Sequence, residues 1–437
     1  MKRVLLSTAL TLFGLIHAYT VQAQDFNLLE TEFAKSSILP RHHFGFCLYD
    51  LDNDSLVFGK KENQYFTPAS NTKTYTLFTS LKHLSDSIAG IHYVERGDSL
   101  IFWGTGDPTF LHPKLDTRRV YDFLKNSNKR LFYVIQQTSE EKYRNGWSIE
   151  DYQEYYQPEI APFPIYGNLV TLRSNGSGLV ASPAYFNKQL RISERNNRNF
   201  WVSRKLTSNE FELSTIHVPR NFNTSKPFIW TDSLAVQLLQ DTLHKSIGIL
   251  PHYERPADIK TVYSASRNVV LREMMLPSDN FLAEHLHMLV SDKIYNGFYT
   301  DSLRQHMQTT YYNNFQDTIF LRDGSGLSSY NKITPRNMVD LLVAIKNMIP
   351  DESQRYLFFP AGGVDGTLKA AYALDQGQPF VWAKTGTINS VHCQSGYIVT
   401  RSGKKYAFSF LNNNYAVPTS YIRREMVRIM TYIRQNY

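Results

Sequence analysis

The sequence has few cysteines and no long internal apolar run. Only Cys47 and Cys393 occur among 437 residues, too few for the disulfide framework that holds small secreted domains together. We expect two buried free thiols, and a disulfide between them stays open as the alternative. No internal stretch reaches the about 18 consecutive apolar residues that a membrane-spanning helix needs. We therefore expect no transmembrane span in the mature chain.

Metal-ligand spacings and dense basic runs are also missing. The segment Glu284–His287 lacks the two histidines four residues apart that a helical zinc motif uses. The formal net charge of +8 suits an anionic partner, but the basic residues are scattered and follow no nucleic-acid-binding pattern. We expect no metal, no cofactor and no nucleic-acid partner, and a general attraction to an anionic polymer.

The N-terminus differs from the rest of the chain. Lys2 and Arg3 precede an apolar run over residues 4–18, and small residues follow at Val21 and Ala23. This order is typical of a secretory signal peptide. We expect residues 1–23 to be removed and the mature protein to lie outside the cytoplasm, in the periplasm or at the cell wall. No cysteine stands near the cleavage site, so we expect no lipid anchor.

Length and aromatic content predict more than one domain and many strands. A chain of this size exceeds what one hydrophobic core usually supports, and its 28 Tyr and 27 Phe residues favour strands. Residues 44–59 alternate around a turn at 52–54, which predicts a β-hairpin. Between about 90 and 260, short strand-like runs predominate and long helical periodicity is scarce. These runs are Ser99–Trp103, Leu131–Gln136 and Leu169–Arg173.

Helical periodicity returns towards the C-terminus. The pattern predicts helices over 266–275, 279–291 and 335–348 and strands over 393–400 and 405–412. In the last segment, Tyr421–Tyr437, the apolar side chains share one helical face. We expect this segment to pack on a sheet as a core helix, while its arginines leave a membrane-surface helix as the alternative.

Ser70 and Lys73 form the first candidate chemical motif. Thr67 and Pro68 are typical of an N-cap and a first helical residue, so Ser70 should lie in the first turn of a helix. Residues three apart share a helix face, which brings the Lys73 ammonium beside the Ser70 hydroxyl. A serine needs a neighbouring base to become a nucleophile, and a lysine can be that base when burial lowers its pKa. Taken alone, the pair is also typical of a capped helix with a surface lysine.

Two more short motifs follow in the chain. Residues 278–280 (Ser-Asp-Asn) directly precede an expected helix and by themselves are typical of an N-cap cluster. Residues 384–387 (Lys-Thr-Gly-Thr) follow a strand-like run, and this combination can bind a carboxylate while leaving room for a substrate backbone. Together and in this order, the three motifs are the signature of penicillin-binding proteins and class A β-lactamases.

On these motifs the chain resembles the D-alanyl-D-alanine carboxypeptidase/endopeptidase branch of the low-molecular-mass class C penicillin-binding proteins. That branch carries a large insertion between its first two motifs, and here the whole stretch 74–277 separates them. Similar stretches also occur at 104–108, 323–328 and 363–368, while the region 110–260 matches only loosely. Ser325 lacks the spacing of a G-x-S-x-G nucleophile elbow, so we interpret 323–328 as a loop near the active site.

The resemblance implies a role for each motif residue. Ser70 would be the nucleophile, Lys73 its base, and Ser278 the relay for a proton to the leaving amine. The resemblance also implies substrate-binding residues, which are Asn280, Lys384, Thr385, Gly386 and Thr387. The backbone N–H groups of Ser70 and Thr387 would form the oxyanion hole. The implied substrates are peptidoglycan stem peptides, and β-lactams would be covalent inhibitors.

The implied fold is an α/β multidomain chain. Its transpeptidase/β-lactamase-like core, an antiparallel sheet flanked by helices, would span 24–100 and 261–437, and a β-rich insertion would span 101–260. A β-lactamase or esterase on the same fold, and a catalytically silent wall-binding protein, are the alternatives. The long insertion argues against the former, and the intact Ser70, Lys73 and Lys384 argue against the latter. Carboxypeptidase and endopeptidase action stay open.

Overall fold

A five-stranded antiparallel sheet is the centre of the larger lobe. The computed structural model describes residues 26–176, 178–194 and 198–437, and the expected signal peptide lies outside them. The strand order is β14-β15-β16-β1-β2, so the first strand of the chain lies inside the sheet beside the last. The strands are β14 (Val381–Ile388), β15 (Val391–Val399), β16 (Lys405–Asn413), β1 (His43–Asp50) and β2 (Ser55–Lys60).

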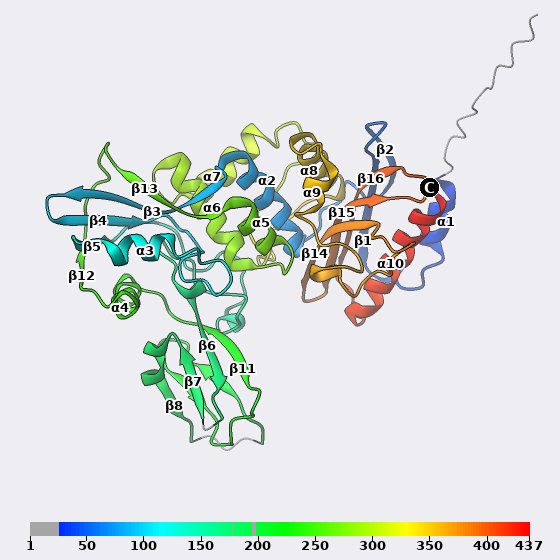
Figure 1. The fold of residues 1–437 in the computed structure, drawn as a ribbon. Coiled ribbons are helices and arrows are strands. Elements are labelled where there is room, and N and C mark those ends of the chain that lie inside the picture. Colours follow the sequence, from blue (N-terminus) through cyan, green and yellow to red (C-terminus); the bar gives the residue numbers. More distant parts are fainter. Residues whose placement is uncertain (1–25, 177, 195–197) are drawn as a thin grey trace, which may run out of the picture.

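Alternate residues of β16 supply the cores on the two faces of this sheet. Phe408 and Phe410 pack on one face against the apolar side chains of the first and last helices. Ala407 and Leu411 belong to the core of the opposite face, because successive strand residues point to opposite sides. Figure 1 shows α1 and α10 on the first face. The helices of the first face are α1 (Asn27–Ala34) and α10 (Thr419–Asn436). The helices that contribute to the core of the opposite face are α2 (Lys73–His83), α5 (Arg267–Met275), α6 (Asn280–Tyr295), α7 (Thr300–Thr310) and α8 (Pro335–Met348). The short helix α9 (Glu352–Tyr356) follows them in the chain.

A second five-stranded sheet lies beside the helices, in the order β12-β5-β4-β3-β13. Its core is separate and includes the apolar face of two helices. The elements are β3 (Ser87–Arg96), β4 (Ser99–Gly104), α3 (Arg119–Asn126), β5 (Arg130–Val134), α4 (Asp232–Leu243), β12 (Ile247–Leu250) and β13 (Lys260–Ser266).

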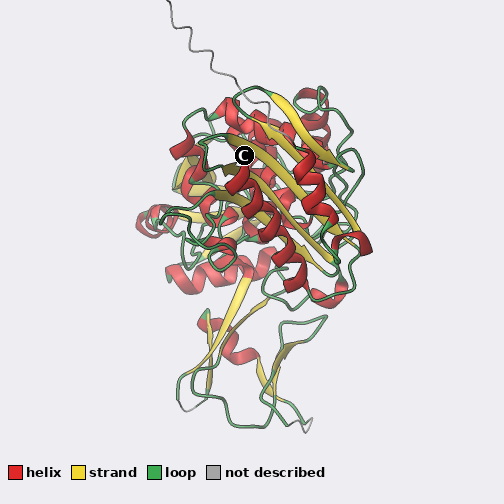
Figure 2. Ribbon diagram, turned by 90° about the vertical axis from the view of Figure 1, so that its right-hand side faces the viewer, coloured by secondary structure: helices red, strands yellow, loops and turns green. Residues whose placement is uncertain are grey.

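Two three-stranded sheets form a lobe that projects from the rest in both views (Figures 1 and 2). The strand orders are β11-β6-β7 and β8-β10-β9. The strands are β6 (Leu169–Ser174), β7 (Leu179–Ser182), β8 (Leu190–Ile192), β9 (Val202–Arg204), β10 (Phe211–Leu213) and β11 (Asn223–Pro227).

Most expected elements are present, but five helices among the described residues were not expected, namely α1, α3, α4, α7 and α9. The hairpin over 44–59 is confirmed as β1 and β2, and the expected helices and strands after residue 265 are confirmed as α5, α6, α8, β15 and β16. Helix is scarce between 90 and 260, as expected: the α-helices described there are α3, with 8 residues, and α4, with 12. The Thr231 hydroxyl caps α4 by accepting from the Leu234 N–H, a signal that the sequence offered. The division at residue 100 falls within β4 and remains a prediction.

The last helix is a core helix. Its apolar face, which includes Ile422, Met426 and Ile433, is at most 1% exposed against the central sheet. Burial of this face excludes the membrane-surface alternative, because such a helix must present its apolar side to lipid. None of the helices in the described ranges has the length and apolarity that a bilayer crossing requires.

The two cysteines are free and buried. Cys47 on β1 lies opposite Ser409, and Cys393 on β15 lies opposite Leu411, so β16 runs between them. Neighbouring strands are about 4.8 Å apart, which separates the two cysteines by about 10 Å, beyond the about 7 Å that a disulfide spans between Cα atoms. The expectation of two free thiols is confirmed.

Candidate active site

Ser70 lies in a tight turn that runs directly into α2. Residues Ala69–Thr72 form a 3-10 turn, and the helix begins at Lys73. Thr67 does not cap it, so that prediction is wrong: the Thr67 hydroxyl instead accepts from Lys332 Nζ at 3.0 Å. Pro68 takes the N-cap position in place of the first helical one. The Ser70–Lys73 pair therefore spans the junction of two helix types.

A glycine from a distant loop fixes this turn. Ala69 has a φ of +46°, an unfavourable value for a residue with a side chain. Gly326 packs so closely on it that a Cβ there would lie 1.9 Å from the Ala69 carbonyl oxygen. Only glycine fits, and its own φ of +85° also favours glycine. The loop 323–328 thus supports the backbone that carries Ser70.

Lys73 is completely buried beside Ser70. Its Nζ lies 3.1 Å from Ser70 Oγ, 2.5 Å from Asn280 Oδ1 and 2.6 Å from the Ser325 carbonyl oxygen. Three acceptors match the three N–H bonds of an ammonium. When the amine loses a proton, it gains a lone pair that can accept one from the serine hydroxyl.

Burial lowers the pKa of Lys73 to about 8. Desolvation disfavours the charged amine, while the nearby carboxylates of Asp323, Asp279 and Glu284 act in the opposite direction. At such a pKa a substantial fraction of the amine is neutral near pH 7 to 8, which is the range where a general base works best.

Residues 278–280 form the start of α6. Ser278 has a φ of +68°, and Asp279 is the N-cap, its carboxylate accepting from the Leu282 N–H at 2.9 Å. Asn280 is the first helical residue; its amide oxygen accepts from Lys73 while its Nδ2 donates to the Tyr156 carbonyl at 2.9 Å. These bonds fix the orientation of the Asn280 amide.

Lys384 is the second buried lysine of the site. It lies on β14, and its Nζ donates to Ser278 Oγ at 2.7 Å and to the Thr385 carbonyl at 2.8 Å. Burial is the main cause that lowers the pKa of Lys384 well below its ordinary value, and the charge of Lys73 adds to it. The structure thus brings all three motifs together.

The threonines of the third motif face the cleft. The Thr385 hydroxyl donates to Thr367 Oγ1 at 2.7 Å, and the Thr387 hydroxyl lies 2.8 Å from His392 Nδ1. Burial lowers the pKa of His392 to about 3, so this imidazole is neutral at physiological pH. Gly386 lies between the two threonines, and a Cβ there would come within 2.7 Å of the Ser70 backbone nitrogen. The missing side chain lets β14 approach the turn that carries Ser70.

A cleft of about 1310 Å³ opens at this junction. β14 is the edge strand of the central sheet, and residues 360–362 pair with its first part only. The motif residues that line the cleft are Ser70, Ser278, Asn280, Thr385 and Thr387. No group of three or more potential metal ligands occurs among the described residues.

A buried charge network behind Lys73 was not predicted from the sequence. Glu284 accepts from the N–H groups of Gly324 and Ser325 at 2.9 and 2.8 Å. Its other oxygen binds Arg144 Nε at 3.3 Å. Asp323 in turn accepts from the Trp147 indole at 2.9 Å. This network holds the Ser325 carbonyl against Lys73. Of its parts, only the loop 323–328 was expected near the active site from the sequence.

The fold, with a Ser-x-x-Lys pair where a helix begins beside the edge strand, defines a penicillin-binding serine enzyme. The model of the D-Ala-D-Ala carboxypeptidase 3 (S13) family matches residues 27–433. The chain belongs to this family.

Individual relatives agree with this assignment. The chain is 28% identical over 207 residues to D-alanyl-D-alanine carboxypeptidase DacB of Haemophilus influenzae, and that alignment covers 43% of this chain and 41% of the relative. The crystal structure of penicillin-binding protein 4 of Haemophilus influenzae superposes with a TM-score of 0.73 at 19% identity, covering 94% of this chain and all of the other. Its complex with a β-lactam superposes with a TM-score of 0.67 at 18% identity over the same shares. The fold expected from the resemblance is confirmed.

Proposed function

We propose that this protein is an exported serine D-Ala-D-Ala peptidase that hydrolyses peptidoglycan stem peptides through an acyl-enzyme on Ser70. One observation carries the proposal: the fully buried Lys73 amine, with a pKa of about 8, lies 3.1 Å from the Ser70 hydroxyl. Family membership supplies the substrate class. A base at that distance and pKa suits proton abstraction from serine near neutral pH.

In the acylation step the Ser70 proton moves to Lys73 as Oγ attacks the carbonyl of the penultimate D-alanine. The carbonyl oxygen becomes an oxyanion, which the N–H groups of Ser70 and Thr387 stabilise. The contact of Gly386 with the nucleophile turn supports this assignment, because it brings the two segments together. Asn280 orients the substrate by bonding its backbone amide.

The C–N bond then breaks and the leaving amine takes up a proton. Ser278 relays this proton from the Lys73 ammonium, which returns to the neutral amine, and the 2.7 Å bond between Ser278 and Lys384 supports the relay role. The leaving group departs with its new N–H bond, and the acyl group stays on Ser70. Water next attacks the ester, which releases the shortened peptide and restores the serine proton.

The terminal carboxylate of the substrate binds Lys384, Thr385 and Thr387. A carboxylate there offsets the desolvation of Lys384 and favours its charged form. An ammonium at Lys384 in turn disfavours a second positive charge on Lys73, since like charges at close range oppose each other.

We also infer export of this protein and the division of its chain. Residues 1–23 act as the signal peptide, and the mature protein works where peptidoglycan lies. Residues 24–100 and 261–437 make the peptidase core around residues 101–260. A family that acts on D-Ala-D-Ala peptides supports this location.

The nucleophile is tested by incubating the mature protein with labelled penicillin, digesting it and mapping the label by mass spectrometry. We expect one label on Ser70 and none in Ser70→Ala. Labelling of the variant, or an unlabelled wild type, would contradict the assignment. Rapid loss of the label would favour a β-lactamase instead, and digestion of crosslinked and uncrosslinked muropeptides separates endopeptidase from carboxypeptidase action.

A further inference from the structure

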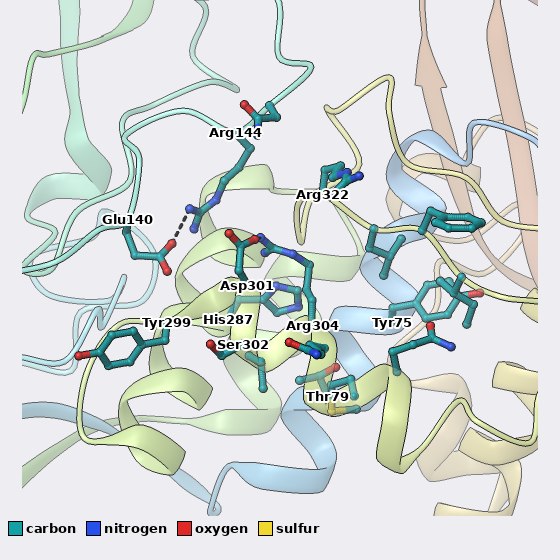
Figure 3. A pocket seen from close by; sticks show the side chains of 18 of the residues that line it. Tyr75, Thr79, Glu140, Arg144, His287, Tyr299, Asp301, Ser302, Arg304 and Arg322 are labelled. Carbon is teal, nitrogen blue, oxygen red and sulfur yellow. Dashed lines mark hydrogen bonds and ion pairs between the residues drawn. The ribbon is translucent and has the colours of Figure 1, made fainter.

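A second cavity lies behind the catalytic lysine. It has a volume of about 470 Å³, a size that holds a small molecule. Tyr75 and Thr79 of α2, His287 of α6 and the first turn of α7 line it. Figure 3 shows these side chains around the cavity, with Arg144, Arg304 and Arg322 among them. None of these residues belongs to the cleft described above.

Two arginines in this cavity have N–H groups without a partner among the described residues. The Arg144 side chain is 6% exposed, and its Nη2 has no hydrogen bond although Nε and Nη1 bind Glu284 and Glu140. Arg304 is 13% exposed in its side chain; Nη2 pairs with Asp301 while the buried Nη1 has no partner. Unpaired buried donors are costly, so these atoms favour a bound acceptor.

A third unpartnered atom is an acceptor. The Thr76 hydroxyl donates to the Gly324 carbonyl at 2.6 Å, so it accepts from the His287 Nε2–H at 3.2 Å. This leaves Nδ1 of His287 without a proton and, among the described residues, without a partner. Arg144, Arg304 and His287 all line this one cavity.

From this combination we propose that the cavity binds a small carboxylate that carries an amino or hydroxyl group beside it, such as an amino acid. The carboxylate oxygens accept from Arg144 and Arg304, and the neighbouring donor bonds His287. Arg322, which is exposed and has no ion pair with any described residue, adds positive charge at the rim. Binding depends on these groups alone, whereas the effect on acylation described next rests on the proposed function.

The cavity is linked to the catalytic lysine by a short chain of bonds. Arg144 binds Glu284, which accepts from the Ser325 N–H, and the Ser325 carbonyl accepts from Lys73. A ligand that draws the Arg144 guanidinium towards itself weakens its contact with Glu284. Occupancy therefore alters the position of the Ser325 carbonyl and the acylation rate at Ser70.

Binding is tested by calorimetry on the full mature protein after penicillin treatment, so that the cleft is filled. The probes are D-alanine, D-lactate, acetate and inorganic phosphate at constant ionic strength. We expect one saturable site for D-alanine and D-lactate, with acetate at least fivefold weaker because it lacks the second donor. Phosphate binding without D-alanine binding, or no saturable binding of any probe, would overturn the proposal.

Variants connect the binding to this cavity. Arg304→Gln should weaken D-alanine binding at least tenfold, whereas Asp301→Asn should tighten it two- to fivefold by freeing Arg304 from a competing carboxylate. The Asp301 side chain is 96% exposed, so its replacement leaves the core intact. Arg96→Gln is the matched control, since Arg96 also pairs with an exposed aspartate, Asp258. Equal binding by wild type and Arg304→Gln would overturn the assignment.

The link to the active site has its own measurement. Saturating D-alanine should change the acylation rate with a fluorescent penicillin two- to fivefold in wild type and leave it unchanged in Arg304→Gln. An unchanged rate in wild type would overturn the coupling between the cavity and Lys73.

Discussion

The two buried lysines of the site, Lys73 and Lys384, have opposite electrostatic surroundings. Lys73 lies among three acceptors and close to the carboxylates of Asp323 and Glu284, which favour its charged form. Lys384 has a serine hydroxyl and a backbone carbonyl, and the nearby charge that acts on it is that of Lys73. Both lysines are 0% exposed, so the difference between their pKa values comes from the neighbouring charges and not from the extent of burial.

This contrast suits Lys73 for proton exchange and Lys384 for binding an anion. The carboxylates partly offset the burial of Lys73, so its pKa stays near the working pH and it can exchange a proton. Lys384 lacks such an offset, and in the proposed function the substrate carboxylate supplies it. One lysine is thus self-sufficient, while the other depends on its ligand.

Removal of Lys73 tests the contrast most strongly. Lys73→Ala should lower the acylation rate about 10³-fold, since a positioned general base contributes on the order of 10² to 10⁴. The rate is measured with labelled penicillin, and circular dichroism checks that the fold is retained. Lys82→Ala, on the same helix, is the control and should acylate normally. Near-normal acylation of the Lys73 variant would remove it as the base.

The ligand dependence of Lys384 is tested with a peptide and its methyl ester. In wild type, esterification of the terminal carboxylate should lower kcat/KM about 10²-fold, as expected for a lost charged hydrogen bond of about 2 to 3 kcal/mol. Lys384→Ala should cause a similar loss with the free acid and little further loss with the ester. If the two losses instead multiply, the carboxylate does not bind Lys384.

The carboxylates near Lys73 are tested through the pH dependence of acylation. Lys73 must be neutral to act, so the rate should rise with pH, reach half of its maximum near the Lys73 pKa of about 8 and level off above it. Glu284 raises this pKa, so Glu284→Gln should move the rise to lower pH. An upward shift, or an unmoved profile, would contradict the role given to these carboxylates.

The smallest expected effect concerns the Thr385 hydroxyl. Thr385→Val should lower kcat/KM for the peptide about 3- to 10-fold, the range for one neutral hydrogen bond. Thr367→Val, which removes only the group that Thr385 contacts, should cost less. A larger loss of kcat/KM in Thr367→Val than in Thr385→Val would contradict direct binding of the substrate by the Thr385 hydroxyl.

The motif residues could be predicted from sequence because their spacing is local. Ser70 and Lys73 lie three residues apart, and the segments 278–280 and 384–387 are each continuous, so short patterns report them. The core helices α6 and α8 were also predictable, since their apolar faces repeat with helical period, whereas α7 was not expected. These signals need no knowledge of distant contacts.

The rest depends on contacts between distant segments. Gly326 is essential to the nucleophile turn only because Ala69 lies against it, and Arg144 meets Glu284 across 140 residues of chain. No periodicity or cap marks such pairs. The misplaced helix start at Thr67 has the same origin, since its hydroxyl is engaged by Lys332, which the local pattern could not reveal.

The position of β1 inside the central sheet governs when the enzyme can first become active during its synthesis. β1 pairs with β16, and β14 reaches the nucleophile turn only as part of that sheet. A ribosome must therefore make residue 413 before the segment that carries Ser70 can find its partner strands. Pairings this far apart in sequence also form slowly, because a long loop must close first. A partly made chain thus carries the nucleophile without the strand that completes its site.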